Sequence, residues 1–158
     1  MERVSSTFRI TISQRPSVVW NALTRPNDLK RWFLREARLE LYPDGNYKFF
    51  WGEKISGKYP VIMSGTCFEV VPEKFLKLTW NSPNDFVQFT LEGREDETLL
   101  TVHVDGFERG SKGHIDESRG WTFYLINLKT VLERDWDLRD SNSKHTLQAG
   151  FVNYYSYK

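Results

Sequence analysis

The side chains able to do acid, base or nucleophilic chemistry are few in this sequence and lie far apart. Its three histidines are His103, His114 and His145. His103 and Asp105 stand at i and i+2 of a predicted strand and so share one face, which would offer a metal ion two ligands. No third ligand is indicated, and we expect this face to point to solvent. The sequence therefore predicts no metal site, no catalytic residue and no cofactor.

One predicted strand, Tyr59 to Val71, carries two more groups of interest. Cys67 is the single cysteine, and with no neighbouring Lys or His to lower its pKa we expect a small buried hydrophobic residue rather than a reactive thiol. Glu69 lies on the same strand face and would be a general-base candidate if burial raised its pKa. We favour the alternative, in which a bulge at Gly65 turns it to solvent.

A long amphipathic helix from His114 to Trp136 is the element that must position any binding site. Its apolar residues recur at i, i+4, i+7, i+11 and i+15, and they are Trp121, Leu125, Leu128, Leu132 and Trp136. Asp116 and Glu117 suit the first turn of this helix, where carboxylates meet the positive end of the helix dipole. Asn127 falls on the opposite, polar side. Phe123 and Ile126 break the pattern, because they place large apolar side chains on that polar side.

Most of the chain before this helix is typical of strands. Proline at the first helical position predicts two short helices, one from Pro16 and one over Asn27 to Phe33. The expected strands are Ser6 to Ser13, Arg38 to Tyr42, Tyr47 to Trp51, Tyr59 to Val71, Phe75 to Trp80, Phe86 to Leu91 and Leu99 to Val104. Because the helices are grouped rather than alternating with strands, this order indicates an α+β fold with an antiparallel sheet.

A curved sheet crossed by a long helix leaves space between the two layers. Aromatic residues make up 15% of the chain, and they suit either a dense core or the lining of a ligand cavity. We predict a cavity for an apolar or aromatic molecule, with the hydroxyls of Tyr47 and Tyr124 and the indole N–H groups of Trp51 and Trp80 orienting the ligand. The residues expected to line it are Trp32, Tyr47, Phe49, Trp51, Trp80, Val87, Phe89, Val102, Val104, Trp121, Tyr124, Leu125 and Leu128.

The length and net charge of the chain limit the classes of molecule that it is expected to bind. A chain of 158 residues is the size of one domain. The net charge of +1, from 22 basic and 21 acidic residues, gives no electrostatic reason to expect nucleic acid or an acidic membrane surface. The first residues lack the apolar run of a signal peptide, and no apolar run reaches the ~18 residues of a membrane span. We expect a soluble cytoplasmic protein.

Several motifs, in order, resemble the activator of Hsp90 ATPase homologue family of the START/Bet v 1-like (SRPBCC) superfamily. They are Val19 to Pro26, Leu29, Trp32-Phe33, Pro43 to Tyr47, Val70 to Glu73, Leu78 to Trp80, Thr98 to Val102, Gly106-Phe107, His114, Gly120-Trp121 and Leu125 to Lys129. One departure is Asp44, where the family often has a second glycine. The resemblance implies a helix-grip fold over residues 1–136, with about six to seven strands, an internal cavity and usually no cofactor.

The superfamily includes lipid and hormone carriers, cyclases, ring-hydroxylase subunits and chaperone activators, so the resemblance does not choose one function. We favour a small-molecule-binding protein. The alternatives are a co-chaperone-like or other protein-interaction module, and a cofactor-free enzyme acting on a cavity-bound hydrophobic substrate.

Residues 137–158 form a tail rich in apolar side chains. They include Leu147, Phe151, Val152, Tyr154, Tyr155 and Tyr157. We predict that this tail packs over Phe123 and Ile126 of its own domain or against a partner subunit, in the second case forming a homodimer.

Overall fold

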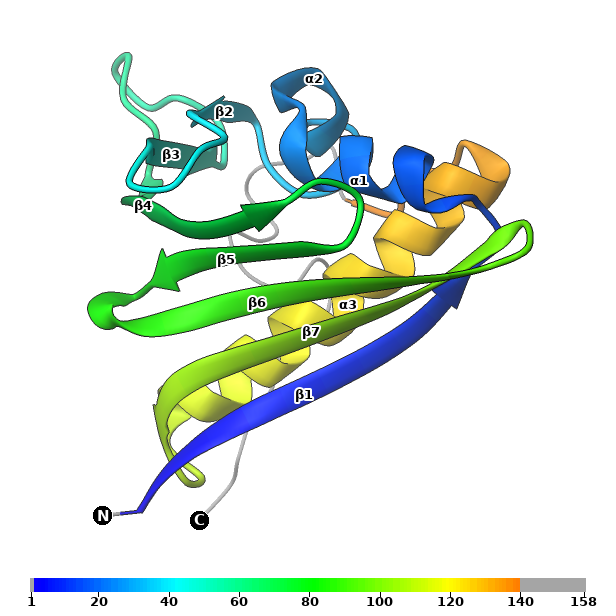
Figure 1. The fold of residues 1–158 in the computed structure, drawn as a ribbon. Helices are drawn as coiled ribbons and strands as arrows, with labels where there is room; N and C mark the ends of the chain where they lie inside the picture. The colour runs from blue at the N-terminus through cyan, green and yellow to red at the C-terminus, as the bar shows by residue number, and fades with distance from the viewer. Residues whose placement is uncertain (1, 140–158) are drawn as a thin grey trace, which may run out of the picture.

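The computed structural model describes residues 2–139. Seven antiparallel strands form one curved sheet, and a long helix lies across it (Figure 1). The elements follow the order β1 (Arg3–Ile12), α1 (Pro16–Thr24), α2 (Pro26–Leu29), β2 (Glu36–Leu39), β3 (Asn46–Trp51), β4 (Val61–Val71), β5 (Phe75–Trp80), β6 (Ser82–Arg94), β7 (Glu97–Glu108) and α3 (Lys112–Arg134). The predicted α+β class and element order are confirmed.

The strand order across the sheet is β1-β7-β6-β5-β4-β3-β2. The chain therefore crosses from one sheet edge to the other between β1 and β2, and α1 and α2 make this crossing (Figure 1). Each begins with the proline expected at its first turn. α2 is shorter than predicted, since it ends at Leu29, and the turn that follows buries Trp32 and Phe33.

Helix α3 begins at Lys112 rather than His114, because Ser111 caps it by accepting a hydrogen bond from the His114 N–H at 3.2 Å. It ends at Arg134 rather than Trp136, because Asp135 takes a left-handed conformation with φ 54°. Trp136 was predicted in the apolar stripe, but it lies beyond the helix with 67% of its surface exposed. The central residues Trp121, Leu125 and Leu128 are buried as expected.

Asn127 was predicted on the polar side of α3, and this was wrong, because it is 0% exposed. Its side-chain amide donates to the Trp32 carbonyl at 2.8 Å and to Asp137 Oδ1 at 3.0 Å. Its carbonyl oxygen accepts from the Leu138 N–H at 2.7 Å. Asn127 thus ties the turn after α2 and the chain after α3 to the helix. A buried amide with these partners is stable where an unsatisfied one would not be.

Two details of the sheet differ from the prediction. The turn expected over Asn81 to Asp85 is shorter than predicted, because β5 ends at Trp80 and β6 already begins at Ser82. Asn81, the residue between the two strands, has a positive φ of 62°. The expected bulge near Gly65 occurs instead between Cys67 and Glu69, where the β4–β5 register shifts. This shift leaves Cys67 buried and Glu69 exposed, so the favoured solvent position of Glu69 is confirmed.

No helix among residues 2–139 is both long enough and apolar enough to cross a membrane. Apart from Leu138, the apolar tail residues lie outside the described part of the chain, so the packing of residues 137–158 stays a prediction. On α3 itself, Ile126 is 48% exposed, whereas Phe123 is half-buried and meets the Tyr124 ring edge-on at 5.4 Å.

A candidate ligand cavity under the long helix

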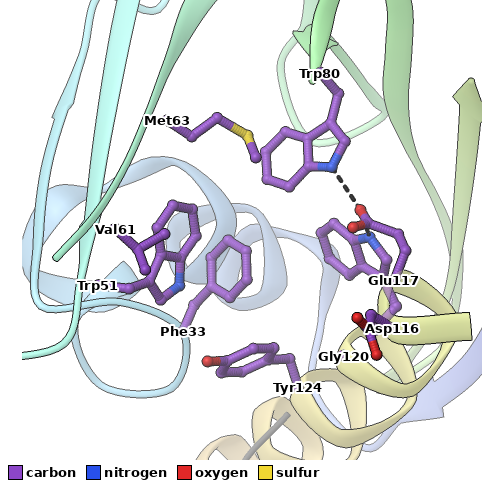
Figure 2. Close-up of a pocket in the computed structure, with 10 residues that line it drawn as sticks. Phe33, Trp51, Val61, Met63, Trp80, Asp116, Glu117, Gly120 and Tyr124 are labelled. Carbon is purple, nitrogen blue, oxygen red and sulfur yellow. Dashed lines mark hydrogen bonds between the residues drawn. The ribbon is translucent and has the colours of Figure 1, made fainter. Parts of the chain in front are cut away.

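A cavity of about 210 Å³ lies between α3 and the half of the sheet formed by β3, β4 and β5. Figure 2 shows its lining, which comes from the turn after α2, from these strands and from the first half of α3. The lining residues are Phe33, Trp51, Val61, Met63, Trp80, Asp116, Glu117, Gly120, Trp121 and Tyr124. An apolar cavity of about 150 Å³ is enough to hold benzene. This space therefore suits a molecule of one or two rings.

Aromatic rings form most of the wall. Phe33 meets Trp51 at 86° and Tyr124 at 85°, with ring centroids 5.2 and 5.0 Å apart. On the other side, Trp121 packs against Trp80 with centroids 5.7 Å apart. Phe33 also packs against Trp121, with centroids 5.5 Å apart and ring planes at 32°, so it joins the two groups of rings. The cavity is therefore bounded by aromatic surface on more than one side.

Glu117 places a carboxylate at one side of this aromatic wall, next to Trp80 (Figure 2). Its Oε1 accepts the indole N–H of Trp80 at 2.6 Å and that of Trp121 at 2.9 Å. Burial raises the pKa of Glu117 above its ordinary value, and the two indole hydrogen bonds oppose that shift without cancelling it. The site thus combines an apolar box with two carboxylates, Asp116 and Glu117, and the Glu117 carboxylate is hydrogen-bonded to two of the lining indoles.

The sequence profile of the family "Activator of Hsp90 ATPase homolog 1-like protein" matches residues 14–133. The chain belongs to this family. Among curated proteins, none matches the chain closely enough to count as a relative.

Solved structures share the fold of this family member. Protein SSP2350 from Staphylococcus saprophyticus superposes with a TM-score of 0.74 at 14% identity, covering 87% of this chain and 98% of its own. The Aha1 dimer from Colwellia psychrerythraea superposes with a TM-score of 0.69 at 22% identity, covering 83% of this chain and 97% of its own. CalU16 from Micromonospora echinospora superposes with a TM-score of 0.65 at 25% identity, covering 85% of this chain and 79% of its own. The helix-grip architecture expected from the sequence is therefore confirmed.

In this family member, four of the thirteen predicted cavity residues line the cavity, namely Trp51, Trp80, Trp121 and Tyr124. The others are buried in the core around it, and they are Trp32, Tyr47, Phe49, Val87, Phe89, Val102, Val104, Leu125 and Leu128. Two of these have polar groups that are already satisfied. The Trp32 indole donates to the Ala22 carbonyl at 2.9 Å, and the Tyr47 hydroxyl donates to the Thr79 carbonyl at 2.5 Å.

Sequence reasoning missed the residues that give the cavity its polarity. Of the four groups expected to orient a ligand, the Trp80 indole N–H is bonded to Glu117, and the Tyr47 hydroxyl is used within the sheet. Glu117 was assigned only to the first turn of the helix, where it suits the helix dipole. Its position one turn before Trp121, at i and i+4, is the signal that places the carboxylate beside that indole.

The remaining reactive groups lie elsewhere. His103 Nδ1 is 2.8 Å from Thr7 Oγ1, and its Nε2 is 3.1 Å from Asp105 Oδ1. The His103 and Asp105 side chains are about one-third exposed (36% and 34%). Cys67 is fully buried, and burial raises the pKa of its thiol to about 11. Within the described residues, no three His, Cys, Asp or Glu side chains are grouped to hold a metal ion.

One further Ser–His contact has the wrong proton arrangement for nucleophilic catalysis. His114 Nδ1 accepts the Gly110 N–H at 3.1 Å, so the ring proton of the neutral imidazole is on Nε2. That nitrogen lies 3.2 Å from Ser6 Oγ and acts as the donor. A base that already carries a proton on this nitrogen cannot take the serine proton.

Glu117→Gln should raise the thermal unfolding midpoint at pH 7. A raised pKa means that the folded protein holds this proton more tightly than the unfolded chain does. The stabilisation from protonation is therefore complete at acid pH and is lost as the pH rises through the folded pKa. Glutamine resembles the protonated form and keeps an oxygen for both indoles. Melting curves from pH 4 to pH 8 should show a gain that shrinks toward acid pH; a lower midpoint for the variant at pH 7 would contradict the assignment.

Proposed function

We propose that this protein binds a small apolar molecule with one or two aromatic rings in the cavity between α3 and strands β3 to β5. The observation that carries the proposal is the aromatic box around a space of about 210 Å³. Ligand pockets are usually concave, mostly apolar and equipped with a few polar groups that orient the ligand. Phe33, Trp51, Trp121 and Tyr124 supply apolar surface, and the carboxylates of Glu117 and Asp116 supply polar groups.

The size of the cavity limits the ligand. Pockets for drug-sized molecules are commonly about 300–1,000 Å³. A space of about 210 Å³ is smaller than this range, so a sterol or a complete lipid would not fit inside it. The protein accordingly binds a compact ring compound, or the ring-bearing end of a longer molecule.

A co-chaperone role would instead use the outer surface. Among the exposed apolar residues there, Phe68 already packs against Phe86 at 5.1 Å, and the Lys77 ammonium lies 4.8 Å from its ring centroid. Phe68 is still 55% exposed, and single exposed apolar side chains of this kind are common on protein surfaces. We therefore favour ligand binding over protein docking as the function, with no reaction assigned to the cavity.

Indole is a suitable probe, because it is neutral, water-soluble and has two fused rings. Calorimetric titration of the purified full chain with indole should show saturable binding at one site. Native mass spectrometry of the protein as isolated from cells should in parallel show an added mass of a small molecule. A protein that carries no added mass and does not bind indole at millimolar concentration would contradict the proposal.

A further inference from the structure

Glu117 differs from the neighbouring carboxylate Asp116 in having no cationic partner among residues 2–139. Asp116, on the same turn, accepts from the Arg119 guanidinium at 3.2 Å and is also paired with the Lys112 ammonium. Among the described residues, Glu117 makes no ion pair, and its only hydrogen bonds are those from the neutral Trp80 and Trp121 indoles. The cations of this turn are therefore engaged by Asp116, and the charge of Glu117 is left without a counter-ion.

The two hydrogen bonds of Glu117 also end on one oxygen. Both indoles donate to Oε1, and within residues 2–139 no hydrogen bond ends on Oε2. A carboxylate can accept about four hydrogen bonds over its two oxygens. The second oxygen is thus available to a donor on a molecule that enters the cavity, and the two indoles hold the carboxylate in place for it.

The aromatic walls of the cavity also favour a ligand that carries a positive charge. The faces of indole and phenyl rings are electrostatically negative, and they attract ammonium groups placed over them. Here the rings of Phe33, Trp51, Tyr124, Trp80 and Trp121 all line the cavity, and the Glu117 carboxylate lies beside Trp80 and Trp121. A neutral hydroxyl would satisfy one oxygen of Glu117 but would leave its charge unbalanced. A protonated amine would satisfy both the hydrogen bond and the charge, and it would lie against aromatic rings.

We propose, building on the ligand-binding function above, that the cavity is specific for organic cations: small apolar or aromatic molecules that carry a protonated amine. The ammonium group donates to Glu117 Oε2, and the apolar part of the molecule lies among the rings of Phe33, Trp51 and Tyr124. Burial of the Glu117 carboxylate supports this assignment, because an incoming cation offsets the cost of keeping that charge away from water.

The test compares two soluble probes of similar shape, 2-phenylethylammonium and 2-phenylethanol, at pH 7. Both can donate a hydrogen bond, but only the first carries a charge. In calorimetric titrations of the wild-type chain, the ammonium should bind about tenfold or more tightly than the alcohol. In Glu117→Gln, the ratio of the two affinities should fall to one or below. The matched control is Glu133→Gln, which removes one negative charge from the far end of α3, where Glu133 pairs with Lys129, and should keep the ratio.

The outcomes separate this inference from the function on which it rests. If the alcohol binds as well as the ammonium, or if Glu117→Gln leaves the ratio unchanged, the charge specificity is wrong while the cavity still binds small molecules. If indole and both phenylethyl probes fail to bind the wild-type chain, the proposed function is wrong and the charge specificity falls with it. Glu117→Gln keeps the acceptor oxygen for the two indoles, and a circular dichroism spectrum matching the wild type would show that its fold is intact.

Discussion

Replacing Gly120 with leucine should abolish indole binding and at the same time raise thermal stability. Gly120 lines the cavity, and a Cβ built there meets no heavy atom within 4 Å, so the new side chain would grow into the open space. Glycine within a helix costs roughly 0.5–1 kcal/mol relative to alanine, and leucine is a good helix former, so the substitution also gains helix stability. Calorimetric affinity should fall by about 100-fold or more, since the ring would have to displace packed carbon atoms.

The matched control for this variant is Gly113→Leu, on the first turn of the same helix. A Cβ at Gly113 meets Phe107 at 3.8 Å, an ordinary contact, and Gly113 is not part of the cavity lining. This control should gain comparable helix stability and keep indole affinity within about twofold, because it leaves the cavity unchanged. Equal binding by the wild type and Gly120→Leu would show that indole does not occupy this cavity.

Asn127→Leu should destabilise the fold by about 2–4 kcal/mol, because each buried polar group left without a partner costs about 1–3 kcal/mol. The Trp32 carbonyl and the Leu138 N–H would both lose the hydrogen bonds they now make with Asn127. Denaturant unfolding monitored by circular dichroism would measure the loss.

The control for this substitution is Thr122→Leu, at an exposed position of the same helix. It should change stability by no more than about 0.5 kcal/mol, because a surface substitution of this kind disturbs no buried partner. If Asn127→Leu were as stable as the wild type, Asn127 would not fasten the turn after α2 to the helix.

The fold could be predicted from periodicity because one face of each main element is buried. Trp121, Leu125 and Leu128 recur at helical spacing, and Phe75–Trp80 alternates with the period of a strand, so both elements follow from burial on one side. Element ends were less accurate where they depend on a single backbone conformation. The left-handed conformation of Asp135 ends α3 before Trp136, and the spacing of the apolar residues does not indicate it.

The cavity was harder to predict, because residue types do not show whether space between layers is filled. Val102 and Leu128 have the same character as the lining residues but pack in the core. Phe33 lies in the cavity because α2 ends at Leu29 and the next turn carries its ring under α3. Asn127 was assigned to the polar side because a helical wheel treats polar residues as exposed, and Glu117 was assigned only to the first turn of the helix. Their partners, Trp32 and Trp80, are far away in sequence and meet them only in the folded chain.

The central claim is that a small ring compound occupies the box formed by Trp51, Trp80 and Trp121. Indole N–H resonances in a ¹H–¹⁵N correlation spectrum report on each of the six tryptophans separately. Titration with unlabelled 2-phenylethanol, whose hydroxyl adds no charge, should shift these three resonances in a saturable way and leave Trp32 unmoved, since its N–H is held by the Ala22 carbonyl in the core. Saturable shifts confined to the exposed Trp136, or no shift at Trp51, Trp80 and Trp121, would contradict the account.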